Sequence, residues 1–128
     1  MSKFLLLFGC LAWLSFLPTA QAEYAYFGFE PQIVTNYIAS KKKLGYVRVS
    51  VELMVKDSGD LEVVEHNAPL LRDAIIDIIG QQTEAQIKSI KGRNDIRKLC
   101  ELKVKHLLKQ ETGKELIKKL LFTQWLDD

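Results

Sequence analysis

The side chains best suited to catalysis or metal binding are few and widely spaced in this sequence of 128 residues. It contains two histidines, His66 and His106, and two cysteines, Cys10 and Cys100. Cys100 and His106 are six positions apart on one predicted helix, which separates them by about 240° around the helix axis. They therefore do not form a metal site or a cysteine–histidine nucleophile pair. We predict a buried Cys100 and a protein with no catalytic residues, no metal and no cofactor.

Glycines and carboxylates do not form a recognisable site either. The six glycines after residue 22 are isolated from one another, at positions 28, 45, 59, 80, 92 and 113, so no phosphate-binding loop is predicted. Carboxylates are present, as on any protein surface, at Glu62, Glu65, Asp73 and Asp77. A pair of catalytic acids is not inferred from them, because such a pair requires a cleft.

Basic residues are frequent in one predicted helix, at positions 97, 98, 103, 105 and 109. Such a group could bind an anionic ligand. However, Arg97, Lys105 and Lys109 are spread around the helix and Glu101 lies among them, so a solvated face is favoured. The formal net charge is +2, and it falls to +1 after residue 22 because Lys3 is the only charged residue before that point. This balance does not indicate a nucleic-acid partner.

The first 22 residues have the features of a secretory signal peptide. Lys3 precedes an apolar run of 14 residues over 4–17, Pro18 ends the run, and Ala20-Gln21-Ala22 supplies the small residues that a signal peptidase accepts. A membrane-spanning helix needs about 20 apolar residues, so we favour cleavage after Ala22 over an uncleaved anchor.

Cleavage at this point leaves one domain, residues 23–128, after a signal peptide over 1–22. Lipidation of Cys10 is rejected, because Phe8 is bulky and the apolar run continues beyond the cysteine. The domain retains a single cysteine, so it has no internal disulfide, but its length is sufficient for a hydrophobic core.

The clearest element of this domain is a strand that begins near residue 46. Aliphatic residues alternate along it with other side chains: Val47, Val49, Val51, Leu53 and Val55. Because side chains alternate across a strand, these five share one buried face, and the opposite face is mostly polar. An earlier strand is predicted over 33–38, after an extended aromatic segment interrupted at Pro31. A polar turn over 40–45 joins the two strands into an antiparallel hairpin.

Helices are predicted after this hairpin. Residues 61–66 form a short turn, and a main helix begins near Asn67, with Pro69 in its first turn, and ends at Gly80. Its apolar face contains Leu70, Leu71, Ala74, Ile75, Ile78 and Ile79. Thr83 is predicted to cap a short helical turn over 83–88.

A further helix is predicted to start after a stop at Gly92. Asn94 would cap it, and it would run to about Gln110 and end at 112–113. Its buried face is predicted to contain Ile96, Leu99, Cys100, Val104, Leu107 and Leu108. The segment after it, KELIKKLLFTQWLDD, fits both a helix and a strand with two covered faces, and its periodicity does not distinguish them.

Several segments, taken in order, resemble the periplasmic domain of the flagellar basal-body-associated FliL family, over nearly all of residues 23–128. YFGFEP followed by IVTN is similar to the opening aromatic–proline segment and first strand of that family, and YVRVSVEL to its second strand. APLLRDAII, IKGRNDIR and LFTQW resemble its helix start, its glycine–basic segment and its closing strand.

The resemblance implies an α+β fold of the SPFH/stomatin type. In it, the C-terminal segment is a strand over about 117–126, which adds to the hairpin to give an antiparallel three-stranded sheet with helices packed on one face. It also implies a non-enzymatic accessory of the flagellar basal body, in the periplasm at the inner membrane, that supports stator assembly or torque for motility. The implied partners are stator and motor membrane proteins, with a possible homo-oligomeric ring. No nucleic acid or small-molecule substrate is expected.

Three residues are candidates for partner binding: Arg72, Asp73 and Ile76. Arg72 and Asp73 match the helix-start motif, although a local ion pair between them is an alternative role. Ile76 lies about 60° beyond the apolar arc of its helix, where it would be either an exposed contact or deeper core. The alternative function is a periplasmic carrier that binds a small apolar ligand between sheet and helices, or an adaptor domain unrelated to flagella.

Overall fold

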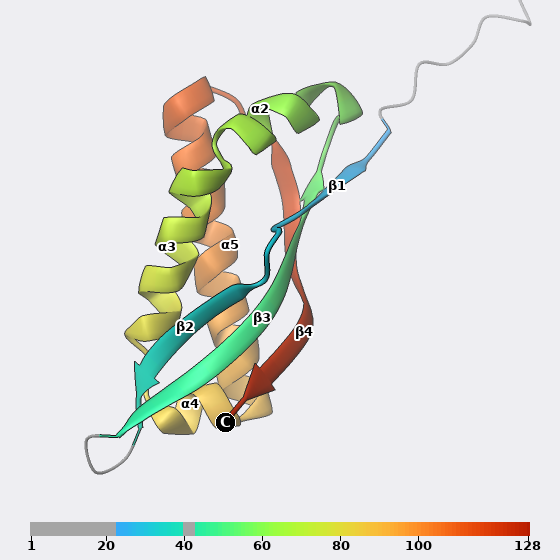
Figure 1. Cartoon of the computed structure of the whole chain (residues 1–128). Coiled ribbons are helices and arrows are strands. Elements are labelled where there is room, and N and C mark those ends of the chain that lie inside the picture. The colour runs from blue at the N-terminus through green and yellow to red at the C-terminus, as the bar shows by residue number, and fades with distance from the viewer. Residues whose placement is uncertain (1–22, 40–42) are drawn as a thin grey trace, which may run out of the picture.

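The computed structural model describes residues 23–39 and 43–128. The predicted signal peptide and its cleavage site lie outside the described residues, as do positions 40–42 of the predicted turn. The fold is α+β, with an open antiparallel sheet and a layer of helices on one side of it (Figure 1). The strands are β1 (Ala25–Gly28), β2 (Ile33–Ile38), β3 (Leu44–Val55) and β4 (Ile117–Asp127). The helices are η3 (Ser58–Asp60), α2 (Leu61–His66), α3 (Ala68–Gly80), α4 (Glu84–Lys88) and α5 (Ile90–Thr112).

The long strand β3 is the centre of the sheet. Along one edge, β2 pairs with its first half and β1 with its last residues, while β4 pairs along the other edge, all antiparallel. The described sheet therefore has four strands, and the prediction of three was wrong. The missed strand, β1, is only four residues long and lies in the segment predicted to be merely extended. It pairs because β3, at 12 residues, is longer than β2 and leaves ladder positions free.

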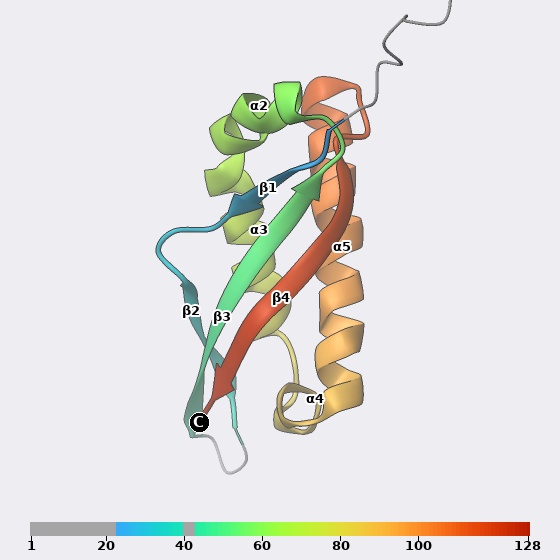
Figure 2. The same cartoon turned by 90° about the vertical axis from the view of Figure 1, so that its right-hand side faces the viewer.

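The alternation predicted for β3 is confirmed. Val47, Val49, Val51, Leu53 and Val55 are all buried, each with at most 1% of its surface exposed. The C-terminal segment is a strand that ends one residue later than predicted, and Leu120 and Ile117 continue the buried face into it. The helices cover this face alone, as the two orthogonal views show (Figure 2).

Residues 61–66, predicted to be a short turn, form the α-helix α2, whereas α3 and α4 form where the sequence predicted them. A break at Asn67 separates α2 from α3, and Pro69 lies in the first turn of α3, where its missing N–H is not needed. Thr83 caps α4 through a capping box with Gln86, in which each side chain pairs with the backbone of the other residue. These local signals suffice because each satisfies backbone groups that a helix end leaves unpaired.

The start of α5 differs from the prediction. The helix begins at Ile90 rather than after Gly92, and its N-cap is Ser89, whose hydroxyl accepts a hydrogen bond of 2.9 Å from the Gly92 N–H. Gly92 is buried within the first turn, against the backbone of Gln86 in α4. The glycine is thus explained by the close approach of two backbones and not by a chain break. The predicted end of α5 is confirmed by Gly113, which has a left-handed conformation with φ of 77°.

The buried stripes of the helices are narrower than predicted. In α3 the fully buried residues are Leu71, Ile75 and Ile79, and in α5 they follow the same spacing of four: Ile96, Cys100, Val104 and Leu108. Leu70 and Leu99, which the periodicity assigned to the core, are 39% and 49% exposed. A helix that lies on one sheet and beside one other helix buries a stripe, and not half of its circumference. No helix among residues 23–39 and 43–128 is both long enough and apolar enough to cross a membrane.

Candidate functional site

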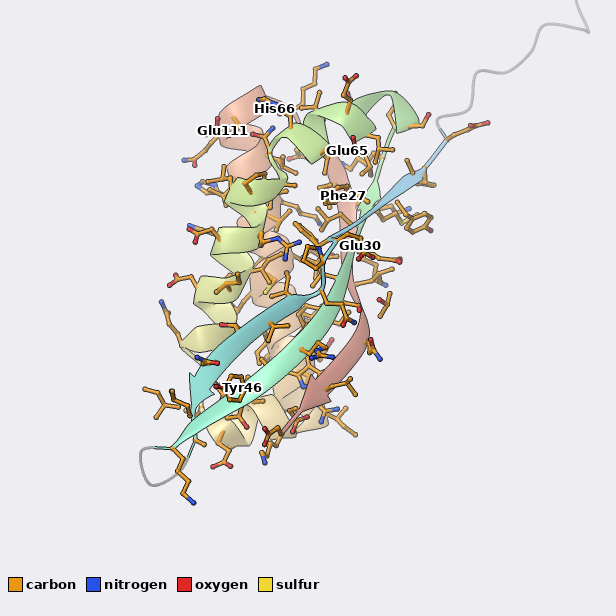
Figure 3. All side chains as sticks on the ribbon, in the orientation of Figure 1. Phe27, Glu30, Tyr46, Glu65, His66 and Glu111 are labelled. Atoms are coloured by element: carbon orange, nitrogen blue, oxygen red, sulfur yellow. The ribbon has the colours of Figure 1, made fainter. Side chains whose placement is uncertain are left out.

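The side chains suited to chemistry form no metal-ligand group in the part of the chain that the structure describes. Figure 3 shows His66 on α2, at the end of the molecule opposite to Tyr46. His106 is exposed on α5, whereas Cys100 is fully buried. Burial raises the pKa of the Cys100 thiol to about 12, so the thiol is protonated at neutral pH and is a poor nucleophile or metal ligand. Within the described part of the chain, no three His, Cys, Asp or Glu side chains are grouped as metal ligands.

Arg72 points from α3 towards the sheet. Its Nη2 donates a hydrogen bond of 2.7 Å to the carbonyl of Pro31, and its guanidinium lies 5.6 Å from the centre of the Phe29 ring. The Glu30–Pro31 peptide bond, in the connection between β1 and β2, is cis. Arg72 therefore fastens this connection to α3, and its observed contacts are with the carbonyl and the ring.

Replacing Arg72 should weaken this attachment without unfolding the protein. For Arg72→Met we expect the free energy of unfolding to fall by about 1–2 kcal/mol, since a charge-assisted hydrogen bond and a cation–π contact are lost at a partly exposed site. Arg48→Met, on the exposed face of β3, is the control and should change it by less than about 0.5 kcal/mol. Urea unfolding of both variants measures the difference, and equal curves would mean that Arg72 holds nothing in place.

Asp73 and Ile76 lie together in a shallow groove between α3 and α5. The groove has a volume of about 340 Å³, and its lining also includes Asp77, Lys103 and Leu107. Asp73 is exposed, while Ile76 is half-buried against the edge of the core, so neither of the roles predicted for Ile76 fully describes it. Of the three candidate residues, the structure brings Asp73 and Ile76 into one groove and directs Arg72 elsewhere.

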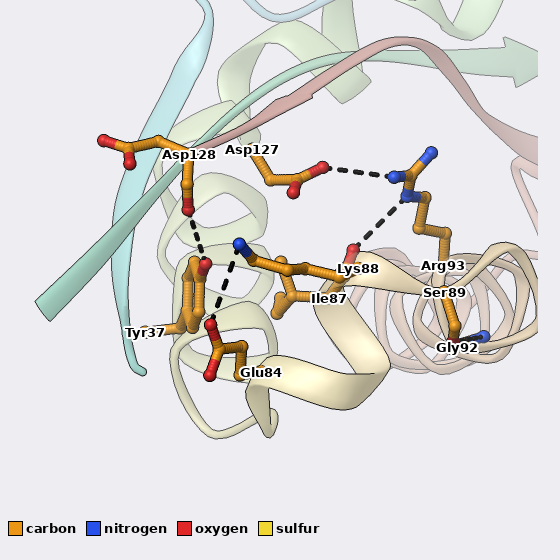
Figure 4. A network of polar contacts seen from close by, with 9 residues as sticks. All are labelled: Tyr37, Glu84, Ile87, Lys88, Ser89, Gly92, Arg93, Asp127 and Asp128. Atoms are coloured by element: carbon orange, nitrogen blue, oxygen red, sulfur yellow. Dashed lines mark hydrogen bonds and ion pairs between the residues drawn. The ribbon is translucent and has the colours of Figure 1, made fainter. Parts of the chain in front are cut away.

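A network of polar contacts joins the C-terminus to α4 and α5 (Figure 4). Arg93 pairs with Asp127 at 3.1 Å and donates to the Ile87 carbonyl at 3.3 Å, and the buried Tyr37 hydroxyl donates to the Asp128 carbonyl at 2.9 Å. Burial raises the pKa of the Tyr37 hydroxyl, which therefore remains the donor. The sequence did not indicate this network, because its members come from four separate elements and have no shared spacing.

The face of the sheet away from the helices is more apolar than the sequence predicted. Val34 of β2 and Leu126 of β4 lie on either side of Arg48 of β3 in the register of the sheet. Four residues further along β2, the exposed Ile38 lies opposite the exposed Leu44 of β3. The alternation along β3 predicts a polar face, and the apolar side chains of Val34, Ile38 and Leu126 are added to that face by β2 and β4. On the opposite face, the space between sheet and helices is filled by apolar side chains, which gives no support for a carrier of small apolar ligands there.

Comparison with known proteins identifies a family that covers most of the described chain. The family model described as "Flagellar basal body-associated protein FliL" matches residues 26–126. One similar curated protein is "Flagellar protein FliL" of Aquifex aeolicus (strain VF5), which is 31% identical over 97 residues. That alignment covers 76% of this chain and 57% of the relative, so the chain spans little more than half of the length of the relative.

Proposed function

Because the chain belongs to the FliL family of flagellar basal-body-associated proteins, we propose that it is a non-enzymatic accessory that supports stator assembly or torque in the flagellar motor. The observation that carries this proposal is the family match, which extends over almost the whole described domain. A buried, protonated Cys100 is consistent with a role in protein contact and not in catalysis.

The proposed contact surface is the α3–α5 groove. Asp73 and Asp77 give it two carboxylates against the single ammonium group of Lys103, and Ile76 and Leu107 provide apolar area. This combination suits a segment of a motor membrane protein that carries both basic and apolar side chains. In this proposal Arg72 acts indirectly, because it holds the β1–β2 connection against the helix that forms one wall of the groove.

Reversing the charge of Asp73 tests this surface. In a pull-down from membranes that contain the stator proteins, Asp73→Lys should reduce the recovered stator by about tenfold, since it places like charges opposite each other. Asp95→Lys, an exposed acidic residue on α5 outside the groove, is the matched control and should leave recovery unchanged. Normal recovery with Asp73→Lys would exclude the groove, and loss with both variants would indicate an effect of overall charge.

The finer properties in this proposal follow from the family resemblance. They are an SPFH/stomatin-like fold, assembly into a homo-oligomeric ring and a periplasmic location at the inner membrane. The open antiparallel sheet with helices on one face is consistent with the fold type. The proposed export signal over residues 1–22 has a direct test, because mass spectrometry of the protein from cells should give an N-terminus at Glu23. A chain that retains residues 4–17 would instead be anchored by them.

A further inference from the structure

A basic groove lies at the end of the molecule where β3 ends, β4 begins and the first described residues enter the fold (Figure 1). Its volume is about 780 Å³, and it is open on one side. Four lysines line it from three separate segments: Lys56 after β3, Lys105 and Lys109 on α5, and Lys118 on β4. The remaining lining residues are Tyr24, His106, Glu115 and Ile117.

The positive charge of this groove is only partly neutralised. Glu115 is the single carboxylate in the lining, and it is shared by Lys56 at 3.7 Å and Lys109 at 3.6 Å. Lys118 donates to the Tyr24 hydroxyl at 2.9 Å, a contact that orients the ammonium group but does not cancel its charge. The four lysines and Glu115 together give the lining a formal net charge of +3. A concave site with this charge attracts anions more strongly than separate lysines on a convex surface.

The groove also has an apolar component. Tyr24, which is 47% exposed, supplies most of it, and its ring lies under the Lys118 ammonium group, 4.7 Å from ring centre to nitrogen, while Ile117 is buried at the floor. Lysine side chains add their methylene stems to this surface. A ligand that fits both components has a phosphate group joined to a less polar portion.

We propose that this groove binds the phosphate ester of an anionic phospholipid headgroup. The shared chemistry is that of any phosphate monoester or diester, and the lipid is favoured as its source for two reasons. The groove is open, so the acyl chains can remain outside it. In addition, the exposed Tyr24 ring and the lysine stems offer apolar surface, which the glycerol backbone and first acyl carbons of a lipid can contact and inorganic phosphate cannot. The proposal does not depend on the flagellar function or on the α3–α5 groove.

The test is a calorimetric titration of the full chain, in mild detergent, with dihexanoyl phosphatidylglycerol. Dihexanoyl phosphatidylcholine and inorganic phosphate are titrated in parallel, the first to test the requirement for net negative charge and the second to test for a soluble source. We expect saturable binding of phosphatidylglycerol that weakens as salt is added. Phosphatidylcholine and inorganic phosphate should each bind at least about tenfold more weakly.

Matched lysine pairs on the same helix locate the site. Lys105→Gln with Lys109→Gln removes two charges from the groove and should weaken phosphatidylglycerol binding by about tenfold. Lys91→Gln with Lys98→Gln removes two charges from α5 outside the groove and should leave binding unchanged. Should the first pair lower the melting temperature, Lys56→Gln removes one groove lysine outside α5 and should still weaken binding.

Three results would overturn the proposal. Equal affinity for phosphatidylcholine would mean that binding does not depend on the net negative charge of the headgroup. Equal affinity for inorganic phosphate would identify a soluble anion as the ligand. Equal losses from both lysine pairs would mean that the overall charge of the chain, and not the groove, attracts the lipid. None of these results bears on recovery of the stator with Asp73→Lys, so the two proposals fail independently.

Discussion

Val51→Asp lowers the free energy of unfolding by about 4 kcal/mol, because it places a carboxylate without a partner in the apolar core. Val51 is 1% exposed and lies in the central strand β3, opposite Phe122 of β4. Its carbonyl accepts a hydrogen bond of 3.1 Å from the Phe29 N–H, so the strand has no freedom to turn the new side chain outward there. Urea unfolding followed by circular dichroism measures the loss.

The control for this variant is Tyr46→Asp, on the opposite face of the same strand. Tyr46 is 51% exposed, so an aspartate there remains in water and should cost no more than about 1 kcal/mol, the range of strand propensities. Similar unfolding curves for the two variants would contradict the assignment of the buried face. An unchanged melting temperature for Val51→Asp would contradict it more directly.

Gly92→Ala is expected to destabilise the protein by about 3 kcal/mol, although alanine favours a helix interior by about 1 kcal/mol over glycine. A Cβ atom at position 92 would lie 2.1 Å from the carbonyl oxygen of Gln86 and 2.6 Å from its Cα. These are backbone atoms, so the clash is relieved only if α4 moves away from the first turn of α5. Thermal and urea unfolding of the purified variant give the size of the effect.

Gly80→Ala is the matched control for this second prediction. It lies in the last turn of α3, and a Cβ atom there would make only an ordinary contact of 3.5 Å, with the Asn36 carbonyl oxygen. We expect this variant to be neutral or more stable by up to about 1 kcal/mol. If Gly92→Ala were also neutral, the close packing of α4 on α5 would be incorrect.

These two positions illustrate what the sequence could predict. The face of Val51 was predictable because the alternation of side chains along a strand is a local property, repeated five times within β3. The role of Gly92 was not, because a glycine that admits another backbone has the same local signature as a glycine that ends a helix. The partner backbone, at Gln86, is identified only when α4 and α5 are folded against each other.

Pairings between distant segments were predicted less well. The C-terminal segment fitted two periodicities, and only the resemblance to a family identified it as β4. The short strand β1 was missed because four residues carry little periodic signal, and its formation depends on the free ladder positions of β3. Leu70 and Leu99 were assigned to the core because the sequence gives the apolar arc of a helix but not the width that its neighbours cover.

The candidate sites divide in the same way. The scarcity of catalytic groups followed from spacing along the chain, since Cys100 and His106 occupy different sides of one helix. The basic groove could not be predicted from spacing along the chain. Lys56 and Lys118 lie near the lysines of α5 only because β3 pairs with β4. The basic residues of this helix were predicted to be a solvated face. For Lys105 and Lys109, the structure adds a neighbourhood that a single helix cannot reveal.

Deletion of the gene, followed by a soft-agar motility assay and a pull-down with the complemented strain, tests the proposed motor function most directly. We expect a smaller swimming zone in the deletion strain, restored by the wild-type gene, and recovery of stator subunits with the tagged protein. Normal motility together with no motor protein recovered would contradict it.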